Sequence, residues 1–352
     1  MSTTVRPTPS PDREAERSQL LTDLKYRWPA RYRSSWVALV LLFVFVMLFV
    51  RTAFTGPSVT LVTALAGTLV IAALGQSLII MLGALDLSVS AIISVAAGIT
   101  VHYGVEGASV PAVLAAALIV PVLLSLVNGV LISVLRLNAL IVTLATVGII
   151  LGAITLWTGQ SLSLTGQSPQ SLQDFAQTTV FGVSMCFLVA LVICVVMAAL
   201  LGKTRFGCQI AAVGANRRAG RVLGMRTTTV ELGTFALAGL LYGLAGILLA
   251  GYIGTPDVVA GAPYQLATIT VAGIAGAMFS GGPASVASVL SACLFLQLLD
   301  QALSIVGLPA GARVAIQGLV LVVAVAAITL GQFGASGFRR VLPIGRSRRS
   351  TS

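Results

Sequence analysis

The chain has 352 residues, of which 57% are hydrophobic and only 9% are charged. Because a soluble globular domain carries about 25% charged residues, this composition excludes an ordinary soluble protein. Apolar runs of about 18 or more residues recur along the chain, as in membrane-spanning helices, whereas the alternation of outer-membrane β-strands is absent. We therefore expect an all-α, polytopic membrane protein.

Ten apolar segments follow a polar tail at residues 1–35, which lacks the early apolar core of a cleavable signal peptide. Pro121 is expected to kink the fourth of them. The transmembrane domain thus covers residues 36–333, and a basic tail follows at 334–352. The expected spans are about 36–54, 61–82, 87–103, 110–134, 139–158, 181–201, 232–252, 265–279, 284–306 and 314–333.

The net charge of +11 is distributed in a way that argues against a nucleic-acid partner. Seven of the 21 Lys and Arg residues lie in residues 1–35, six in 203–226 and five in 339–349. Since basic clusters beside apolar spans stay in the cytoplasm, ten spans place both termini and the loop 203–229 on the cytoplasmic side of the inner membrane. The polar segment 159–179 then lies outside, where we expect a loop with a short helix.

The two halves of the chain are weakly similar, which indicates a two-fold internal repeat. Transporters often contain such repeats, and paired interrupted segments mark their transport path. Chance similarity between apolar sequences is the alternative explanation. The matching pairs are 126–129 with 298–301, 153–156 with 327–330, and the Gly-rich breaks Gly83–Ala91 with Gly276–Ala284.

Asp86 stands between two apolar runs, together with the hydroxyls of Ser88 and Ser90. An ionisable side chain inside a span costs about 2.5–3.5 kcal/mol on insertion scales, so it faces a protein interior or an aqueous cavity. Two explanations are open. Asp86 or Ser88 caps the following helix by accepting backbone N–H bonds, or Asp86 lies on a substrate path.

Further polar side chains lie within the apolar spans, and they suit a polar, uncharged solute that leaves water. These are Gln76, Asn128, Asn138, Thr143, Thr146 and Asp300. Hydrogen bonding between helices, worth about 0.6 kcal/mol on average, is the alternative role for each. Gly239 and Gly243 form a GxxxG pattern, which indicates close helix packing.

No catalytic constellation stands out in the sequence. His102 is the only histidine, no cluster has metal-ligand spacing, and no HExxH is present. Gly202-Lys203-Thr204 resembles the end of a phosphate-binding loop, but Met197 stands where that loop needs glycine. We expect no catalytic residue, no metal and no cofactor, so ATP hydrolysis would need a separate chain.

The loop 203–229 contains one short amphipathic helix between Asn216, a suitable N-cap, and Gly224, a suitable helix stop. Its apolar positions Ala219, Val222 and Leu223 have helical spacing. A cytoplasmic helix of this kind docks into the groove of a partner. The alternative is a basic loop that serves only topology.

Several motifs resemble, in order and spacing, the permease subunit of bacterial ABC importers. The resemblance is to the ribose, xylose and arabinose type within the branched-chain amino acid and sugar permease family. The chain departs from the family at Ala84, Ser90, Ala284 and Asn138-Ala139, which leaves the substrate open. The motifs are Gly75-Gln76 through Gly83 with Asp86-Leu87-Ser88-Val89; Asn128-Gly129 with Arg136-Leu137 and Ile141-Val142-Thr143-Leu144; Thr204-Arg205-Phe206-Gly207 with Gly214, Asn216, Ala219 and Gly224; and Ser280-Gly281-Gly282 with Ser285.

The resemblance implies a set of partners. Two permease copies, as a homodimer or heterodimer, would work in the lipid membrane with cytoplasmic ATP-binding subunits and an extracytoplasmic solute-binding protein. Loop 213–225 would be the coupling helix that docks on the ATPase. The implied ATPase-coupling residues are Arg205, Phe206, Gly207, Gly214, Asn216, Arg217, Ala219, Arg221 and Gly224.

We therefore expect a permease that imports a monosaccharide, a pentose or hexose, by alternating access driven by a partner ATPase. The substrate path would involve Gln76, Asp86, Ser88, Ser90, Asn128, Asn138, Thr143, Thr146 and Asp300. Two alternatives remain. One is a proton-coupled secondary transporter that uses Asp86 and Asp300, and the other is an ABC permease for a non-sugar solute such as branched-chain amino acids.

Overall fold

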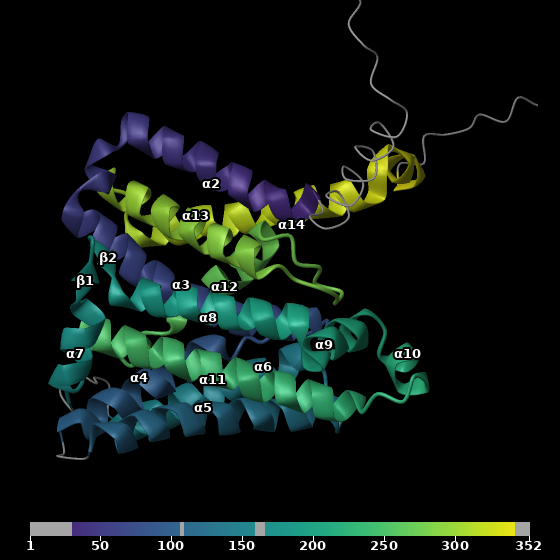
Figure 1. Ribbon diagram of the computed structural model, residues 1–352, viewed down its shortest axis with the longest axis horizontal. Coiled ribbons are helices and arrows are strands. Elements are labelled where there is room, and N and C mark those ends of the chain that lie inside the picture. The colour runs from purple at the N-terminus through teal and green to yellow at the C-terminus, as the bar shows by residue number, and fades with distance from the viewer. Residues whose placement is uncertain (1–29, 106–108, 159–165, 342–352) are drawn as a thin grey trace, which may run out of the picture.

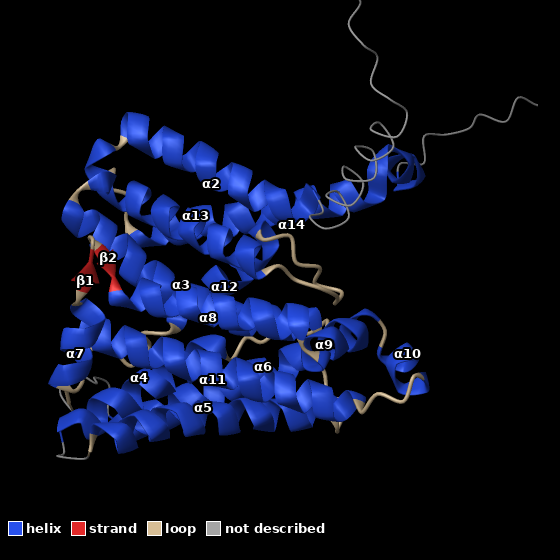
Figure 2. Cartoon of the chain, in the orientation of Figure 1, coloured by secondary structure: helices blue, strands red, loops and turns tan. Residues whose placement is uncertain are grey.

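A computed structural model describes residues 30–105, 109–158 and 166–341. Its helices lie side by side along one axis, and a small β-hairpin and a short helix occupy one end of the bundle (Figures 1 and 2). The hairpin pairs β1 (Thr179–Val180) with β2 (Val183–Ser184) in antiparallel register. The helices are α2 (Ala30–Phe49), η1 (Arg51–Phe54), α3 (Gly56–Met81), α4 (Val89–Val105), α5 (Val110–Ser133), α6 (Ala139–Thr158), α7 (Gln170–Gln177), α8 (Met185–Lys203), α9 (Arg205–Ala215), α10 (Arg217–Val222), α11 (Thr227–Ile253), α12 (Ala262–Ile274), α13 (Val286–Ile305) and α14 (Ala310–Val341).

A helix stands at each of the ten predicted spans, which confirms the all-α polytopic fold. Among the described residues, seven helices are long and apolar enough to cross a membrane, and α4 and α14 carry shorter apolar stretches. With 13 residues, α12 is only about 20 Å long, less than the roughly 30 Å of the hydrocarbon core. It ends at Ile274, before the predicted 279, because the backbone turns at Gly276.

The ends of the chain differ in detail from the expected boundaries. The first helix of the described part, α2, begins at Ala30, six residues before the expected span, and its N-terminal turn is tied to α13 and to the segment just before it. Tyr32 donates to the carbonyl of Pro283 (2.9 Å), and Ser288 donates to the carbonyl of Tyr32 (3.1 Å). At the other end, α14 runs to Val341 and so includes the start of the predicted basic tail; residues 1–29 and 342–352 lie outside the described part.

The core of the bundle is built on α3 and α11. In the most apolar stretch of α3, 94% of the residues are buried, whereas the share is 17% in α2 and 22% in α5, α6 and α8, as expected of helices that face lipid. Close approach of α11 depends on glycine. A Cβ added to Gly239 would lie 2.7 Å from the Pro121 carbonyl oxygen, and one added to Gly243 would lie 3.0 Å from that of Ala117. The predicted close packing of the GxxxG pattern is confirmed.

Two non-helical segments, which we call breaks, lie between helices within the core. The first break, Gly83–Ser88, joins α3 to α4, and the second break, 275–285, joins α12 to α13. Gly83 and Gly276 both have φ of 78°, a conformation that favours glycine. The backbone N–H of Gly282 donates to the Met81 carbonyl at the end of α3 (3.0 Å), and a Cβ added to Gly83 would lie 3.2 Å from the Ser280 carbonyl oxygen. The two breaks that resemble each other in sequence therefore also touch in space.

Candidate functional site

Asp86 is fully buried at the start of α4. The first hydrogen bond of that helix runs from Ile92 N–H to the carbonyl of Ser88 (2.9 Å). Asp86 Oδ1 accepts from the Ser88 backbone N–H (2.8 Å) and from Ser88 Oγ (2.5 Å). The carboxylate thus satisfies an N–H that no helical carbonyl can reach, which is the capping role expected as one of the two explanations.

The hydrogen bonds continue from Ser88 into two further helices. Asn128 Nδ2 on α5 donates to Ser88 Oγ (2.9 Å), and Thr146 Oγ1 on α6 donates to Asn128 Oδ1 (2.6 Å). Ser88 and Asn128 are fully buried. This set, which we call the Asp86 network (Asp86, Ser88, Asn128, Thr146), fixes the first break against α5 and α6.

Gln76 lies beside this network on α3. The Tyr242 hydroxyl on α11 donates to Gln76 Oε1 (3.1 Å) and lies next to the carboxyl group of Asp86. Gln76 Nε2 and Asp86 Oδ2 are both buried, and neither has a hydrogen-bond partner among the described residues. One donor and one acceptor therefore lie unpaired beside the same tyrosine, and each needs a partner such as a water molecule or a solute hydroxyl.

The first turns of α4 and α12 meet at Ser90. Its Oγ donates to Gln265 Oε1 (3.0 Å), and the N–H of Gly261 donates to Ser94 Oγ (3.0 Å). Helix α4 therefore begins in the buried core close to Asp86, whereas α12 begins beside it with Ala262 and Pro263 exposed. Helix N-termini carry partial positive charge, and interrupted helices of transporters place such ends at their binding sites.

Three of the predicted path residues form no hydrogen bond with the Asp86 network, Gln76 or Ser90. Asn138 is exposed and caps α6 by accepting from Leu140 N–H (2.9 Å). Thr143 is buried, but its hydroxyl donates to a carbonyl of its own helix. Asp300 pairs with Arg313 of α14 (2.7 Å) and accepts from Gln317 (3.2 Å).

The basic loop folds into two helices. Asn216 Oδ1 accepts from Ala219 N–H (3.0 Å), and Gly224, with φ of 77°, follows the end of α10; both signals were predicted. The preceding helix, α9, was not predicted. Its signals are Thr204, which caps it through Gly207 N–H (3.2 Å), and an apolar face at helical spacing. That face is formed by Phe206, Ile210 and Val213.

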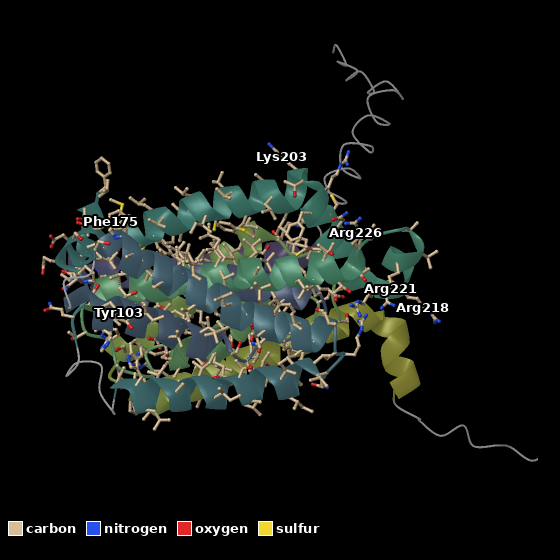
Figure 3. The ribbon with its side chains drawn as sticks, turned by 90° about the horizontal axis from the view of Figure 1, so that it is seen from below. Tyr103, Phe175, Lys203, Arg218, Arg221 and Arg226 are labelled. Atoms are coloured by element: carbon tan, nitrogen blue, oxygen red, sulfur yellow. The ribbon has the colours of Figure 1, made fainter. Side chains whose placement is uncertain are left out.

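The outer surface of α10 is both apolar and basic. Val222 and Leu223 are 84% and 74% exposed at the end of the bundle. Lys203, Arg218, Arg221 and Arg226 gather at the same end, opposite Tyr103 and Phe175 (Figure 3). Because charged residues surround it and lie at or beyond the ends of the apolar helices, this surface does not belong in hydrocarbon. We call Val222, Leu223, Arg218 and Arg221 the α10 surface.

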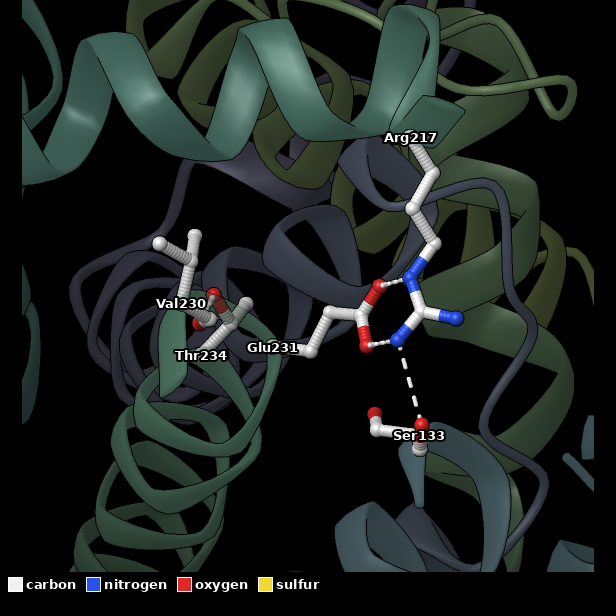
Figure 4. A network of polar contacts seen from close by, with 5 residues as sticks. All are labelled: Ser133, Arg217, Val230, Glu231 and Thr234. Atoms are coloured by element: carbon white, nitrogen blue, oxygen red, sulfur yellow. Dashed lines mark hydrogen bonds and ion pairs between the residues drawn. The ribbon is translucent and has the colours of Figure 1, made fainter. Parts of the chain in front are cut away.

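Arg217 takes a different role from the other loop arginines. Its guanidinium forms a two-point ion pair with the Glu231 carboxylate on α11, and Nη2 also donates to the carbonyl of Ser133 at the end of α5 (3.1 Å; Figure 4). Planar guanidinium and carboxylate groups match in such pairs. Arg217 therefore anchors α10 to the bundle, so its charge is already engaged within the chain.

Comparison with known proteins assigns the chain to a protein family. The family described as "Branched-chain amino acid transport system / permease component" matches residues 58–325. The chain belongs to this permease family. The resemblance expected from the sequence motifs is thereby confirmed, and the permease is a component of a transport system embedded in the membrane.

Its relatives include the autoinducer 2 import system permease protein LsrC. The LsrC proteins of Escherichia coli O9:H4 (strain HS) and Shigella flexneri are 30% identical to the permease over 298 residues, which cover 85% of its chain and 86% of theirs. LsrC of Salmonella typhi is 30% identical over the same length. No solved structure matches the permease.

Proposed function

We propose that the permease is the membrane subunit of an ABC importer for a monosaccharide, a pentose or hexose, driven by separate ATPase subunits. The observation that carries this proposal is the α10 surface. A folded helix that turns Val222 and Leu223 outward at the basic end of a membrane bundle is built to be covered by a partner. The family of the chain supports the same function.

The distribution of charge sets the orientation. Basic loops remain in the cytoplasm, so the end with α9 and α10 faces the cytoplasm together with both termini. The ATPase subunits dock there. A solute-binding protein delivers cargo to the opposite end, which carries α7 and the β-hairpin (Figure 1). A second permease copy, identical or related, completes the pathway.

The polar centre around Asp86 supports a hydroxylated cargo. Gln76 Nε2 and Asp86 Oδ2 offer an unpaired donor and an unpaired acceptor, and a sugar hydroxyl can both donate and accept. Because these groups are buried, a sugar reaches them only after the helices separate, as alternating access requires. LsrC proteins belong to import systems for autoinducer 2, so small sugar-like signals are included among the candidate cargoes.

The test changes the α10 surface alone. We expect the Val222→Ser/Leu223→Ser double variant to insert into membranes normally but to lose co-purification with the ATPase subunits and ATP-dependent uptake. The control for ATPase binding is Phe181→Ser, which removes a fully exposed apolar side chain from the hairpin at the other end and should leave co-purification with the ATPase subunits unchanged. Full ATPase binding and uptake by the double variant would contradict the proposal.

Two other functions have a specific observation in their favour. The unpaired carboxylate oxygen of the buried Asp86 suits proton coupling, which predicts uptake that an uncoupler abolishes in vesicles without ATP. The family description suits branched-chain amino acids. Competition by unlabelled sugars or amino acids against labelled cargo, in proteoliposomes with and without ATP, separates the three.

A further inference from the structure

Three backbone segments that are distant in sequence meet at the basic end of the bundle. They are Met81–Gly83 at the end of α3, Gly214 in the last turn of α9, and Gly281–Gly282 in the second break. A Cβ added to Gly214 would overlap the Met81 carbonyl oxygen and lie 3.2 Å from Leu82 Cα. One added to Gly281 would overlap the carbonyl of Gly214 and lie 3.2 Å from Gly83 N.

No side chain separates these segments. The Met81 carbonyl, one of the last in α3, accepts from Gly282 N–H (3.0 Å), so its hydrogen-bonding capacity is used by the same contact. Leu85 and Phe279 pack nearby against a small buried cluster of Ile80, Ala272 and Ala277. Contacts between main-chain atoms cannot adjust by changing rotamers, and close-packed interiors transmit displacement.

The contact lies between the two functional parts described above. Gly214 stands two residues before Asn216, which caps α10, and Met81 stands five residues before Asp86. A short stretch of chain therefore connects the α10 surface, through one backbone contact, to the segment that holds the Asp86 network. Gly83, with φ of 78°, allows the chain to turn within that segment.

We propose that this backbone junction (Met81, Gly214, Gly281 and Gly282) carries movement of α9 and α10 into the first break, and that Gly214 is its positioning residue. The inference rests on the proposed function, because it assigns the route by which an ATPase docked on α10 moves the polar centre. The junction works as a rigid contact: α9, the end of α3 and the second break move together.

The principal test is Gly214→Ala, with Gly220→Ala as the matched control on α10. A Cβ on Gly220 meets only ordinary contacts, the nearest at 3.5 Å. We expect Gly214→Ala to co-purify with the ATPase subunits as the unaltered chain does, while uptake per hydrolysed ATP falls at least ten-fold. Gly220→Ala should leave both quantities unchanged. Equal uptake per hydrolysed ATP in the two variants would overturn the proposed role of the junction.

A second measurement decides the matter if Gly214→Ala does not accumulate in membranes. Leu82→Cys and Ala215→Cys are placed on either side of the contact, in a chain whose exposed Cys208 is replaced by Ser. A short bifunctional thiol reagent then bridges them. Because the junction moves as one body, uptake should survive cross-linking; its loss, with ATPase binding intact, would overturn the proposal.

The same experiments separate this inference from the proposed function. If the unaltered permease neither binds ATPase subunits nor imports in their presence, both ideas are wrong. If the unaltered permease assembles and imports, and Gly214→Ala does so equally well, only the junction is wrong.

Discussion

Replacement of Asp86 tests whether its carboxylate acts by hydrogen bonding or by charge. In Asp86→Ala the buried Ser88 N–H loses its partner, which costs about 1–3 kcal/mol, and the Ser88 hydroxyl loses an acceptor worth about 0.6 kcal/mol within a membrane protein. We therefore expect the free energy of unfolding to fall by about 2–4 kcal/mol. Asp86→Asn retains an oxygen at the same position and should lose less than about 1 kcal/mol.

The assay is thermal unfolding of the purified permease in detergent, with ATP-dependent uptake measured on the same variants in proteoliposomes. Asp174→Ala is the control, because Asp174 is exposed on α7 and such changes stay within about 0.5 kcal/mol. Asp86→Ala should unfold at a clearly lower temperature than Asp86→Asn, and Asn should keep uptake. Equal stability of the two variants would refute the capping role. Loss of uptake in a stable Asp86→Asn would show that the charge itself is needed.

Three further predictions concern packing and ion pairs. Gly239→Ala should destabilise the bundle by about 1–3 kcal/mol through overpacking. The control is Gly148→Ala, which should not, because its Cβ would meet open space. Equal unfolding midpoints of the two variants would contradict close packing of α11 against α5. Arg217→Ala should lower the free energy of unfolding by up to about 3–5 kcal/mol, since it leaves the largely buried Glu231 carboxylate unpaired. Limited proteolysis should then cut this variant near α10. The control variant Arg218→Ala should behave as the unaltered chain in both assays. Asp300→Asn should cost less than about 1 kcal/mol and retain uptake; a selective loss of uptake would instead place Asp300 on the substrate path.

The helices that face lipid could be predicted from sequence because hydrophobic length alone determines them. The structure has α6 at 139–158, as expected, and α5 ends one residue from the expected position. The ends of α10 were predictable for a different reason. Asn216 and Gly224 act locally, through a side-chain cap and a positive φ, so their effect does not depend on the rest of the fold.

Other features depend on which helices pack together, and periodicity contains no information about that. Asn128 meets Ser88 across 40 positions, and Tyr242 meets Gln76 across 166. The family resemblance implies that Arg217 is an ATPase-coupling residue, and that role stays a prediction. Its partner within the chain, Glu231, could not be predicted, because the approach of α11 to α10 determines it. The length of α12 was overestimated because its apolar sequence continues past the turn at Gly276.

The sequence identified several polar residues that lie together in the structure, but it could not predict their contacts. Ser88, Asn128 and Thr146 do join Asp86, whereas Asn138 and Asp300 are committed elsewhere. Polar residues in apolar segments signal that a partner exists, since burial without one is costly. They do not say which partner, and the role of each in transport stays a prediction.

The burial of α3 has a consequence for how the protein is made. Among the described spanning helices this one is the second to leave the ribosome, yet it packs against α8, α11, α12 and α13, which are synthesised much later. Until then the surface of α3 at Gly75 is uncovered. In the folded protein the Tyr242 ring packs there so closely that a Cβ added to Gly75 would lie 2.6 Å from it. Insertion of α3 and completion of its surroundings are therefore separate events in biogenesis, and a nascent chain that stops before α11 has a spanning helix but no core.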